Sequence, residues 1–526
     1  MSEIHATVSP SSDHSLPLIK SHSHSGLEAS VHLPATLPRA ILQLLADTVP
    51  TFLFYLSNML VWTFNLYYAG KKNDANLTSS VGLTNTWMGA TIFYIIFGLN
   101  IGTTATCSQA LGAKEYTVAG FAYHRALISR LSIALLLYPL QFFSENIFTL
   151  FGYQQMVAQD AGTFCRYQIA VVILIIFYDT TKSMLMANGI YSPFIVIQSI
   201  GIVAHWFLLD LFVMKTTWGV LGFCVAMTGT YLIMLTLLIM YICIAKPCPE
   251  VFFFLKKESF KHIIHQLREE IPIGGILYLD FAAEQIAVML AGTYPAEEFA
   301  AQILNYNVMS VMTLLPIGFS ATLTTYVGCA AGENDLQKLS TYIKAGFIIT
   351  LGFLVVEGPA LYFLSEPLAR IFSDDMSVIG ATQTLERMYS FAMVADFTQL
   401  VMSAILRGIG KEHIACVIFL LGNYVVGLPA AFVLGTVLKK YSKGLLLGII
   451  SGMVVNAAAT SFALWKTNLR RQAESIANRI DAKAKIGKFA GSYSSFKASF
   501  RTSFMKISQM KLSQMKTSQH RAPVAK

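Results

Sequence analysis

Long apolar blocks with very few charges recur along the whole 526-residue chain and limit the folds that it can adopt. Residues 346–364 and 414–434 are two examples. A bilayer span needs about 20 apolar residues in a helix that rises about 1.5 Å per residue. Because 55% of the residues are hydrophobic and 13% are charged, a water-soluble core could not hide this apolar surface. The chain is therefore predicted to be an all-α polytopic membrane protein.

Windows of low charge that end at charged residues or at Gly, Pro and Asn predict about twelve transmembrane helices. The expected spans are residues 40–69, 82–111, 120–143, 160–187, 190–213, 219–245, 271–292, 300–331, 340–364, 379–407, 412–437 and 444–466. An even count places both termini on the same side of the membrane. We expect that side to be the cytosol, because the C-terminal end of the chain is strongly basic.

Two pseudo-symmetric six-helix lobes between two tails are the expected domain organisation. The predicted boundaries are a disordered N-terminal tail at 1–38, an N-lobe at 39–262, a C-lobe at 263–468 and a basic C-terminal tail at 469–526. From residue 466 onward the chain holds fourteen Lys or Arg residues and two acids. Such a tail can contact anionic lipid. The aromatic spacing at Phe496, Phe500 and Phe504 fits either adsorption to the inner leaflet or a solvated, disordered tail.

The two halves share a segment that aligns without a gap. Residues 98–112 lie over residues 318–332, and each segment ends the second span of its half. The coinciding pairs are Gly98/Gly318, Thr104/Thr324, Ala110/Ala330 and Gly112/Gly332. This match predicts a duplicated unit, and transporters commonly bind substrate at the interface between such repeats.

Isolated acids inside the spans are the main functional candidates, because a charge near the bilayer midplane is costly. Asp280 is predicted near mid-depth in the seventh span, and Glu284 lies one turn later on the same face. Asp396 lies midway along the tenth span, and no Lys or Arg occurs within one turn of either aspartate. Such an acid can carry a proton between alternating states, or it can be a structural acid that stays protonated or pairs with a distant base.

Other polar residues within the spans have a weaker claim to function. Glu357, beside a Gly-Pro pair, would sit where a broken helix admits water. His205 could be a proton relay, but a structural hydrogen bond is the favoured interpretation. Asp47 and Asp179 have little support as functional sites, and Lys182 is the expected partner of Asp179.

The remaining features exclude several kinds of site. The seven cysteines show no CxxC spacing and are interpreted as packing residues, so neither a disulfide framework nor a metal site is expected. The Ser-His repeats at residues 21–25 could bind metal weakly, but a polar tail is favoured. Asn76 begins the Asn-Leu-Thr sequence of a possible glycosylation site. No cofactor and no nucleic-acid partner are expected.

Four short motifs occur along the chain: Ser-Gln-Ala-Leu-Gly-Ala-Lys-Glu-Tyr at 108–116, Leu-Met-Ala-Asn-Gly-Ile-Tyr-Ser-Pro at 185–193, Arg-Gly-Ile-Gly at 407–410 and Gly-Asn-Tyr-Val-Val-Gly-Leu-Pro at 422–429. Together they resemble the multidrug and toxic compound extrusion (MATE) family, and more closely its eukaryotic branch, across residues 40–468. In this order and spacing they are a specific signal. Within the motifs that the two lobes carry, we select five positions as candidate functional residues: Gln109, Gly112, Gly332, Arg407 and Gly408.

The resemblance also carries over candidate site residues. It assigns proton or cation coupling and substrate binding to Asp280 and Asp396, because Pro272 and Gly292 keep the family spacing around Asp280. At two further positions where the family has an acid, this chain has the amides Gln285 and Asn307. The site would therefore keep polar contacts at these positions but carry less negative charge. Apolar and aromatic wall residues such as Tyr278, Phe281 and Tyr306 would complete the site together with Glu284.

The resemblance implies a secondary active antiporter and not an enzyme. Such a protein would act as a monomer in the lipid bilayer and export organic cations, xenobiotics or metabolites in exchange for H⁺ or Na⁺ by alternating access. Plasma membrane and vacuolar or other endomembranes both fit. A lipid or lipid-linked substrate flippase is the alternative, although the spans lack the basic cluster that would bind phosphate groups. A His-dependent membrane acyltransferase is less favoured, because His205 has no partner motif.

Overall fold

The computed structural model describes residues 36–72, 74–372 and 375–485, and every regular element in those ranges is a helix. Eleven helical stretches there are long and apolar enough to cross a membrane. The bent pair of α4 (Tyr116–Phe142) and α5 (Ser144–Leu150) gives a twelfth span if it is counted as one. The predicted all-α membrane fold is therefore confirmed. The tail patterns predicted at 21–25 and 496–507 lie outside the described residues.

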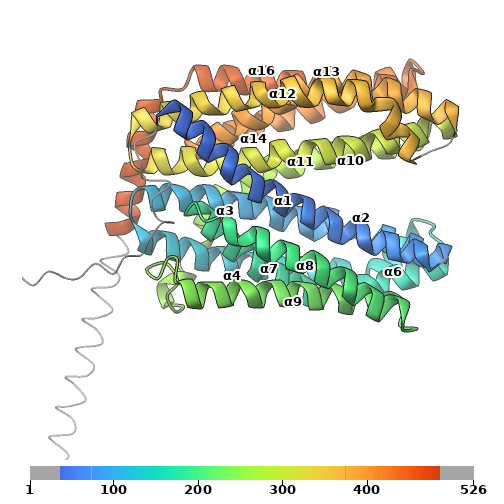
Figure 1. Cartoon of the computed structure of the whole chain (residues 1–526), viewed down its shortest axis with the longest axis horizontal. Helices are drawn as coiled ribbons and strands as arrows, with labels where there is room; N and C mark the ends of the chain where they lie inside the picture. The colour runs from blue at the N-terminus through green and yellow to red at the C-terminus, as the bar shows by residue number, and fades with distance from the viewer. Residues whose placement is uncertain (1–35, 73, 373–374, 486–526) are drawn as a thin grey trace, which may run out of the picture.

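Two layers of helices form the molecule, and each layer comes from one half of the chain (Figure 1). The first half also contains α1 (Leu37–Lys71), α2 (Ala75–Met88), η1 (Gly89–Phe93), α3 (Tyr94–Gly112), α6 (Gln155–Tyr167), α7 (Ile169–Ala187), α8 (Ser192–Leu209), η2 (Asp210–Met214) and α9 (Val220–Ala245). The second half contains η3 (Lys257–Phe260), α10 (Ile263–Ala291), α11 (Ala296–Gly332), α12 (Leu336–Phe372), α13 (Met376–Gly408), α14 (Glu412–Leu420), η4 (Leu421–Gly427), α15 (Leu428–Phe432), η5 (Val433–Val437) and α16 (Tyr441–Trp465).

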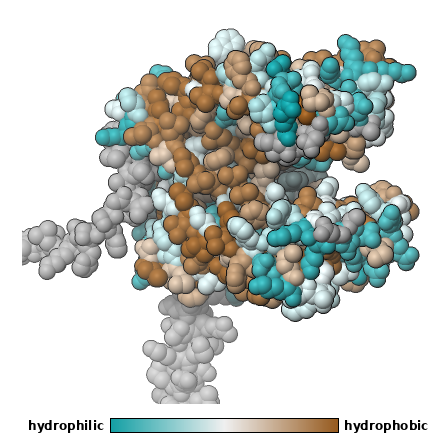
Figure 2. Space-filling model, turned by 45° about the vertical axis from the view of Figure 1, so that its right-hand side comes forward, coloured by the Kyte–Doolittle hydropathy of each residue, from teal (hydrophilic) through white to brown (hydrophobic). Residues whose placement is uncertain are grey.

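The first helix of each half crosses to the second long helix of the other half. Helix α1 packs against α11, and α10 packs against α3. The halves meet at the end where α3 and α11 terminate, and we call this the closed end. At the opposite end a cleft separates them, as the space-filling view shows (Figure 2). We call that side the open end.

Glycines of the repeated segment bring α3 and α11 together at the closed end. A Cβ added to Gly112 would lie 2.1 Å from the carbonyl oxygen of Cys329, and a Cβ added to Gly332 would lie 2.0 Å from that of Gln109. Helices in a membrane approach this closely only where small residues face each other. The aligned glycines that predicted a duplication thus form the contact between the halves.

Buried polar groups reinforce the same end. Gln109 Nε2 donates to the carbonyl oxygen of Gly408 over 3.0 Å and so links the two halves. Arg130 of α4 and Glu270 of α10 form an ion pair at 2.5 Å, and both side chains are fully buried. Glu270 was expected to precede the seventh span at residue 271, but α10 begins at Ile263 and includes it. The sequence boundary was wrong because the span continues through a charged segment.

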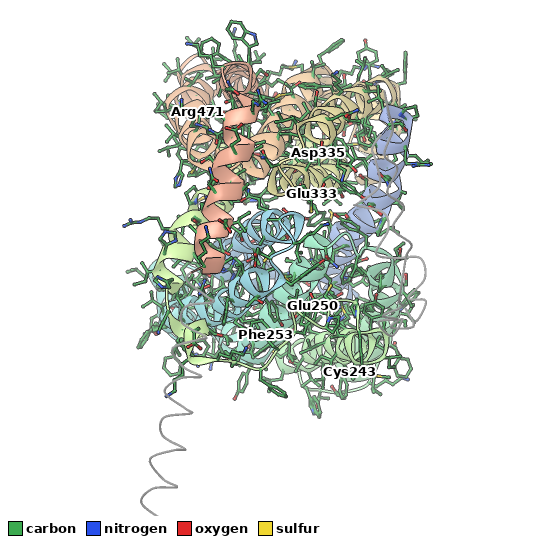
Figure 3. All side chains as sticks on the ribbon, turned by 90° about the vertical axis from the view of Figure 1, so that its left-hand side faces the viewer. Cys243, Glu250, Phe253, Glu333, Asp335 and Arg471 are labelled. Atoms are coloured by element: carbon green, nitrogen blue, oxygen red, sulfur yellow. The ribbon has the colours of Figure 1, made fainter. Side chains whose placement is uncertain are left out.

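A further helix at residues 469–485 crosses the closed end (Figure 3). Lys483 Nζ lies 3.0 and 2.9 Å from the two carboxyl oxygens of Glu269 on α10. Arg479 Nη2 donates to Oε1 of Gln109 over 2.7 Å, so the helix also contacts the first half. Ile480 is buried in an apolar cluster with Ala331. The predicted basic tail therefore begins with a packed helix and not with a free segment.

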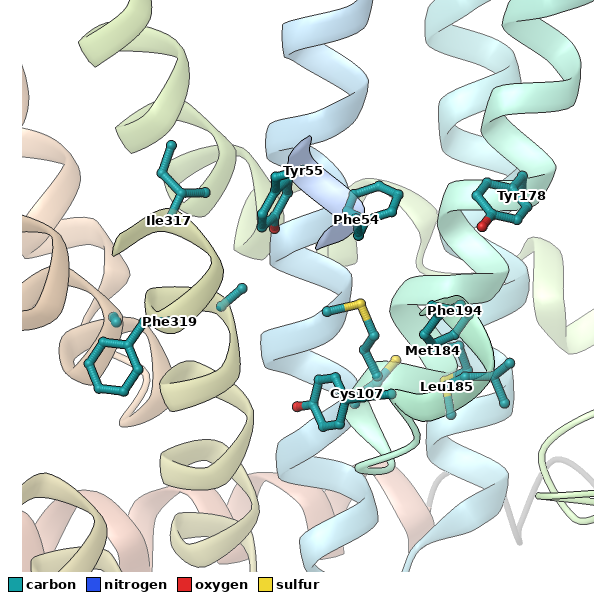
Figure 4. Close-up of a cluster of buried hydrophobic side chains, with 14 of the residues drawn as sticks. Phe54, Tyr55, Cys107, Tyr178, Met184, Leu185, Phe194, Ile317 and Phe319 are labelled. Atoms are coloured by element: carbon teal, nitrogen blue, oxygen red, sulfur yellow. The ribbon is translucent and has the colours of Figure 1, made fainter. Parts of the chain in front are cut away.

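The largest cluster of buried apolar side chains spans both halves. It includes Phe54 of α1, Tyr178 of α7, Phe194 of α8 and Phe319 of α11, which the close-up shows around α3 (Figure 4). All seven cysteines are free thiols. The core therefore joins the halves by apolar packing as well as through the glycine contact.

The glycine contact predicts that Gly112→Ala destabilises the protein. The new methyl group would overlap the backbone of Cys329, and overpacking of a core costs about 1–3 kcal/mol. Thermal unfolding of the purified protein in detergent should show a lower midpoint. Gly352→Ala is the control, because a Cβ there meets no atom within 4 Å and should be neutral or stabilising. Equal midpoints for the two variants would contradict this account.

Candidate functional site

A chain of hydrogen bonds connects the two predicted coupling acids. Asn423 Nδ2 in η4 donates to Asp280 Oδ1 over 3.0 Å, and its own Oδ1 accepts from Nδ2 of Asn456 in α16 over 2.8 Å. Asn456 Nδ2 also donates to Gln399 Oε1 over 3.1 Å. Gln399 Nε2 completes the chain by donating to Asp396 Oδ1 over 3.0 Å. The structure thus brings together two acids that are 116 positions apart in the sequence.

Neutral donors are the hydrogen-bond partners of these two acids. The hydroxyl of Tyr389 donates to Asp396 Oδ2 over 2.7 Å, and both side chains are buried. Within the described ranges, neither Asp280 nor Asp396 forms an ion pair. A carboxylate without a permanent counter-charge can exchange a proton or a cationic ligand.

A water-sized cavity of about 20 Å³ lies next to this chain in the second half. Asp280 and Glu284 both line it, as expected for two residues one helical turn apart. The remaining lining residues are Ala283, Asn423, Gly427, Leu428, Ile449 and Met453. The cavity therefore places two carboxyl groups beside an apolar wall.

Local irregularity and small residues place Asn423 at this cavity. Residues of η4 form π-helical turns, which occur frequently at functional sites. A Cβ on Gly422 would lie 1.9 Å from Asn456 Oδ1, so only glycine allows α16 to approach η4 this closely. The sequence motif Gly-Asn-Tyr around Asn423 could have pointed to this role. Asn423, Asn456, Gln399 and Tyr389 were not among the residues predicted for the site.

Aromatic side chains extend the site toward the first half. Gln285 Nε2 donates to the hydroxyl of Tyr306 over 2.6 Å, so these two predicted site residues are neighbours. Phe281 stacks on Tyr94 of the first half with ring centroids 5.0 Å apart. Asn307 of α11 has an exposed side chain, and its predicted role in the site stays a prediction.

The first half places its membrane polar groups in local hydrogen bonds. His205 Nδ1 lies 2.9 Å from Thr230 Oγ1, and its Nε2 lies 3.2 Å from Asn65 Oδ1. Both ring nitrogens therefore have a partner in a fully buried site. This supports the structural interpretation of His205 over the relay.

The two first-half aspartates are also paired. Lys182 Nζ lies 3.4 Å from Asp179 Oδ1, which confirms the predicted pair. The same ammonium group lies over the ring of Phe54. The hydroxyl of Tyr326 in the second half donates to Asp47 Oδ2 over 2.5 Å. Asp179 is thus engaged within the first half, and Asp47 at the contact between the halves.

Glu357 occupies an unbroken helix. Helix α12 runs continuously past Pro359, so the predicted break that would admit water is wrong. Both carboxyl oxygens of Glu357 are buried without a hydrogen-bond partner among the described residues.

The MatE family model matches residues 49–209 and 272–433, one segment in each half and more than half of the chain. The chain belongs to the MatE family. This MatE protein is 22% identical to Protein DETOXIFICATION 16 of Arabidopsis thaliana over 414 residues, which cover 78% of this chain and 85% of that protein. It is 23% identical to Protein DETOXIFICATION 14 of the same plant over 404 residues, which cover 76% and 83%. These matches make it a multi-pass membrane transporter.

Solved MATE structures share the fold of this MatE protein. The crystal structure of the eukaryotic MATE transporter AtDTX14 superposes with a TM-score of 0.80 at 22% identity and covers 84% of this chain and 99% of that one. The bent form of the Vibrio cholerae MATE transporter VcmN gives a TM-score of 0.74 at 18% identity over 84% and 99%. The two-layered helical architecture is therefore that of MATE transporters.

The hydrogen-bond chain predicts that Asn456→Ala destabilises this MatE protein. The substitution leaves the buried oxygens of Asn423 and Gln399 without their donor, and each unsatisfied group costs about 1–3 kcal/mol. The midpoint of thermal unfolding in detergent should fall. Thr236→Ala on an exposed face of α9 serves as the control and should leave the midpoint unchanged. An unchanged midpoint for Asn456→Ala would contradict the structural importance of the chain.

Proposed function

We propose that this MatE protein is a secondary antiporter that exports organic cations or related amphiphilic compounds in exchange for H⁺. The observation that carries the proposal is the chain from Asp280 to Asp396, in which amide groups connect two acids that have no cationic partner. A proton and a substrate cation can then compete for the same negative charge. Binding of one favours release of the other.

Substrate recognition in this proposal uses the cavity and the aromatic wall beside it. Glu284 adds a second carboxyl group next to Asp280. The rings of Phe281, Tyr94 and Tyr306 offer apolar faces that attract organic cations without fixing one shape. The wall therefore supports a broad substrate class of flat or amphiphilic cations.

Alternating access in this proposal uses the two ends of the molecule. The open end would face the outside or a vacuole-like lumen, and the closed end would face the cytosol. The basic helix at residues 469–485 lies at the closed end, and basic segments beside spans are usually retained in the cytosol. We propose that the N-lobe at 39–262 and the C-lobe at 263–468 rock about the contact between α3 and α11 in a monomer. Coupling to Na⁺ is the alternative to H⁺.

Transport in everted membrane vesicles with an imposed pH gradient tests the coupling residues. Asp280→Asn and Asp396→Asn remove the charge and keep the shape, so uptake of a fluorescent cation should fall at least about tenfold. Asp210→Asn is the matched control, because Asp210 forms an exposed ion pair with Lys215 and should transport like the wild type.

The same vesicles distinguish the alternatives. Uptake driven by a Na⁺ gradient, and not by a pH gradient, would replace H⁺ with Na⁺ as the coupling ion. Intact pH-driven uptake in both aspartate variants would refute their proposed role. Lipid scrambling without any cation transport would refute the antiporter.

A further inference from the structure

Two acids of the second half whose carboxyl oxygens are buried take no part in the chain between Asp280 and Asp396. Glu386 of α13 is 0% exposed. Both carboxyl oxygens of Glu386 and of Glu357 are buried without a hydrogen-bond partner in the described part of the chain. A carboxylate in such a place loses its hydration and gains no donor in return, whereas the protonated acid carries no charge to stabilise. These groups are therefore suited to receive a proton.

The outer end of the α12–α13 pair connects Glu386 with the open end of the molecule. Helix α12 ends at this end of the molecule, and α13 begins there (Figure 1). Gln383 Nε2 of α13 lies 3.5 Å from Glu366 Oε2 of α12, whose partner Arg370 is exposed. Glu386 is three residues beyond Gln383, about 4.5 Å deeper along the helix. Glu386 is therefore about one helical turn from the exposed pair of Glu366 and Arg370, which water can reach.

Glu357 lies between Glu386 and Asp396 in depth. A Cβ on Gly358 would lie 3.5 Å from the carbonyl oxygen of Ser390, which puts Glu357 at the level of Ser390. Glu386 is four residues, about 6 Å, nearer to the open end along α13. Asp396 is six residues, about 9 Å, farther in along α13.

Tyr389 connects this series to the coupling acid. It is fully buried, it follows Glu386 by three residues, and its hydroxyl donates to Asp396 Oδ2. Positions three and seven residues apart lie on neighbouring parts of one helix face, so Glu386, Tyr389 and Asp396 form a stripe along α13. The same hydroxyl lies 3.4 Å from Thr313 Oγ1, so it can give its proton to Asp396 and take another through a hydrogen-bonded neighbour.

The basic residues nearby are engaged elsewhere. The guanidinium of Arg387 lies over the ring of Tyr362, 5.2 Å from its centroid. Arg370 pairs with Glu366. Among the described residues, no ion pair neutralises Glu357 or Glu386. The two acids thus keep their capacity to bind a proton.

We propose that Glu386 and Glu357 form the path by which protons from the open end reach Asp396. A proton from water binds the Glu386 carboxylate and then moves to Glu357, directly or through a bridging water. The Tyr389 hydroxyl transfers its proton to the Asp396 carboxylate and is reprotonated by the preceding acid. At each step one O–H bond breaks as one forms, and the donor acid becomes a carboxylate again. The path rests on the proposed H⁺ antiport.

The full chain reconstituted in liposomes, with ethidium as the probe cation, tests this path. Glu386→Gln and Glu357→Gln should slow ethidium uptake driven by a pH gradient, and the proton flux reported by a pH-sensitive dye, at least about tenfold. Ethidium exchange at equal pH needs no net proton transfer and should stay within about twofold of the wild type. Glu386→Asp should restore much of the gradient-driven rate.

Asp210→Asn is the control, because this acid lies outside the α12–α13 pair and forms an exposed ion pair with Lys215. It should transport like the wild type. Gradient-driven uptake at the wild-type rate in both buried-acid variants would overturn the path while leaving the antiporter intact. Equal loss of exchange and uptake would overturn it in favour of a structural role. A wild-type protein without gradient-driven ethidium uptake would overturn the proposed function and the path together.

Discussion

The close approach of α3 and α11 is the constraint on which the rest of the structure depends. Inside a membrane, helices gain little from burying apolar surface against each other, so tight packing of small residues has to hold them together. Gly112 and Gly332 provide that packing at equivalent positions of the two halves. Because the contact lies at one end, the opposite end separates and leaves a cleft (Figure 2). The duplicated segment thus accounts for both the contact between α3 and α11 and the cleft at the open end.

Helix α10 shows how the partner of an acid decides its role. Glu270 is buried beside Arg130, and this pair cannot be broken without leaving an uncompensated charge. Ten residues later, Asp280 has the neutral amide of Asn423 as its partner. The amide holds the carboxyl group in place but does not neutralise it. The same helix therefore supplies a fixed contact at the closed end and an exchangeable charge at the cavity.

Depth and helical period allowed Asp280, Glu284 and Asp396 to be predicted, because a charge in an apolar span stands out in the sequence. The amides that connect two of these acids were missed for a physical reason. Asparagine and glutamine cost less to bury than a charge, so Asn423 and Gln399 do not stand out in the same way. The boundary of the seventh span was misplaced because the partner of Glu270 lies 140 positions away. Local composition cannot reveal such a distant neutralising group.

The asymmetry between the halves follows from how each one satisfies its polar groups. In the first half, His205 has a hydrogen-bond partner for each ring nitrogen, and Asp179 has a lysine. In the second half, Asp280 and Asp396 have neutral donors only. In the proposed antiporter, proton or cation exchange at these two acids changes the charge of the second half. Asp47 of the first half also has a neutral donor, the Tyr326 hydroxyl of the second half, so the halves differ in how many such acids they hold and not in kind.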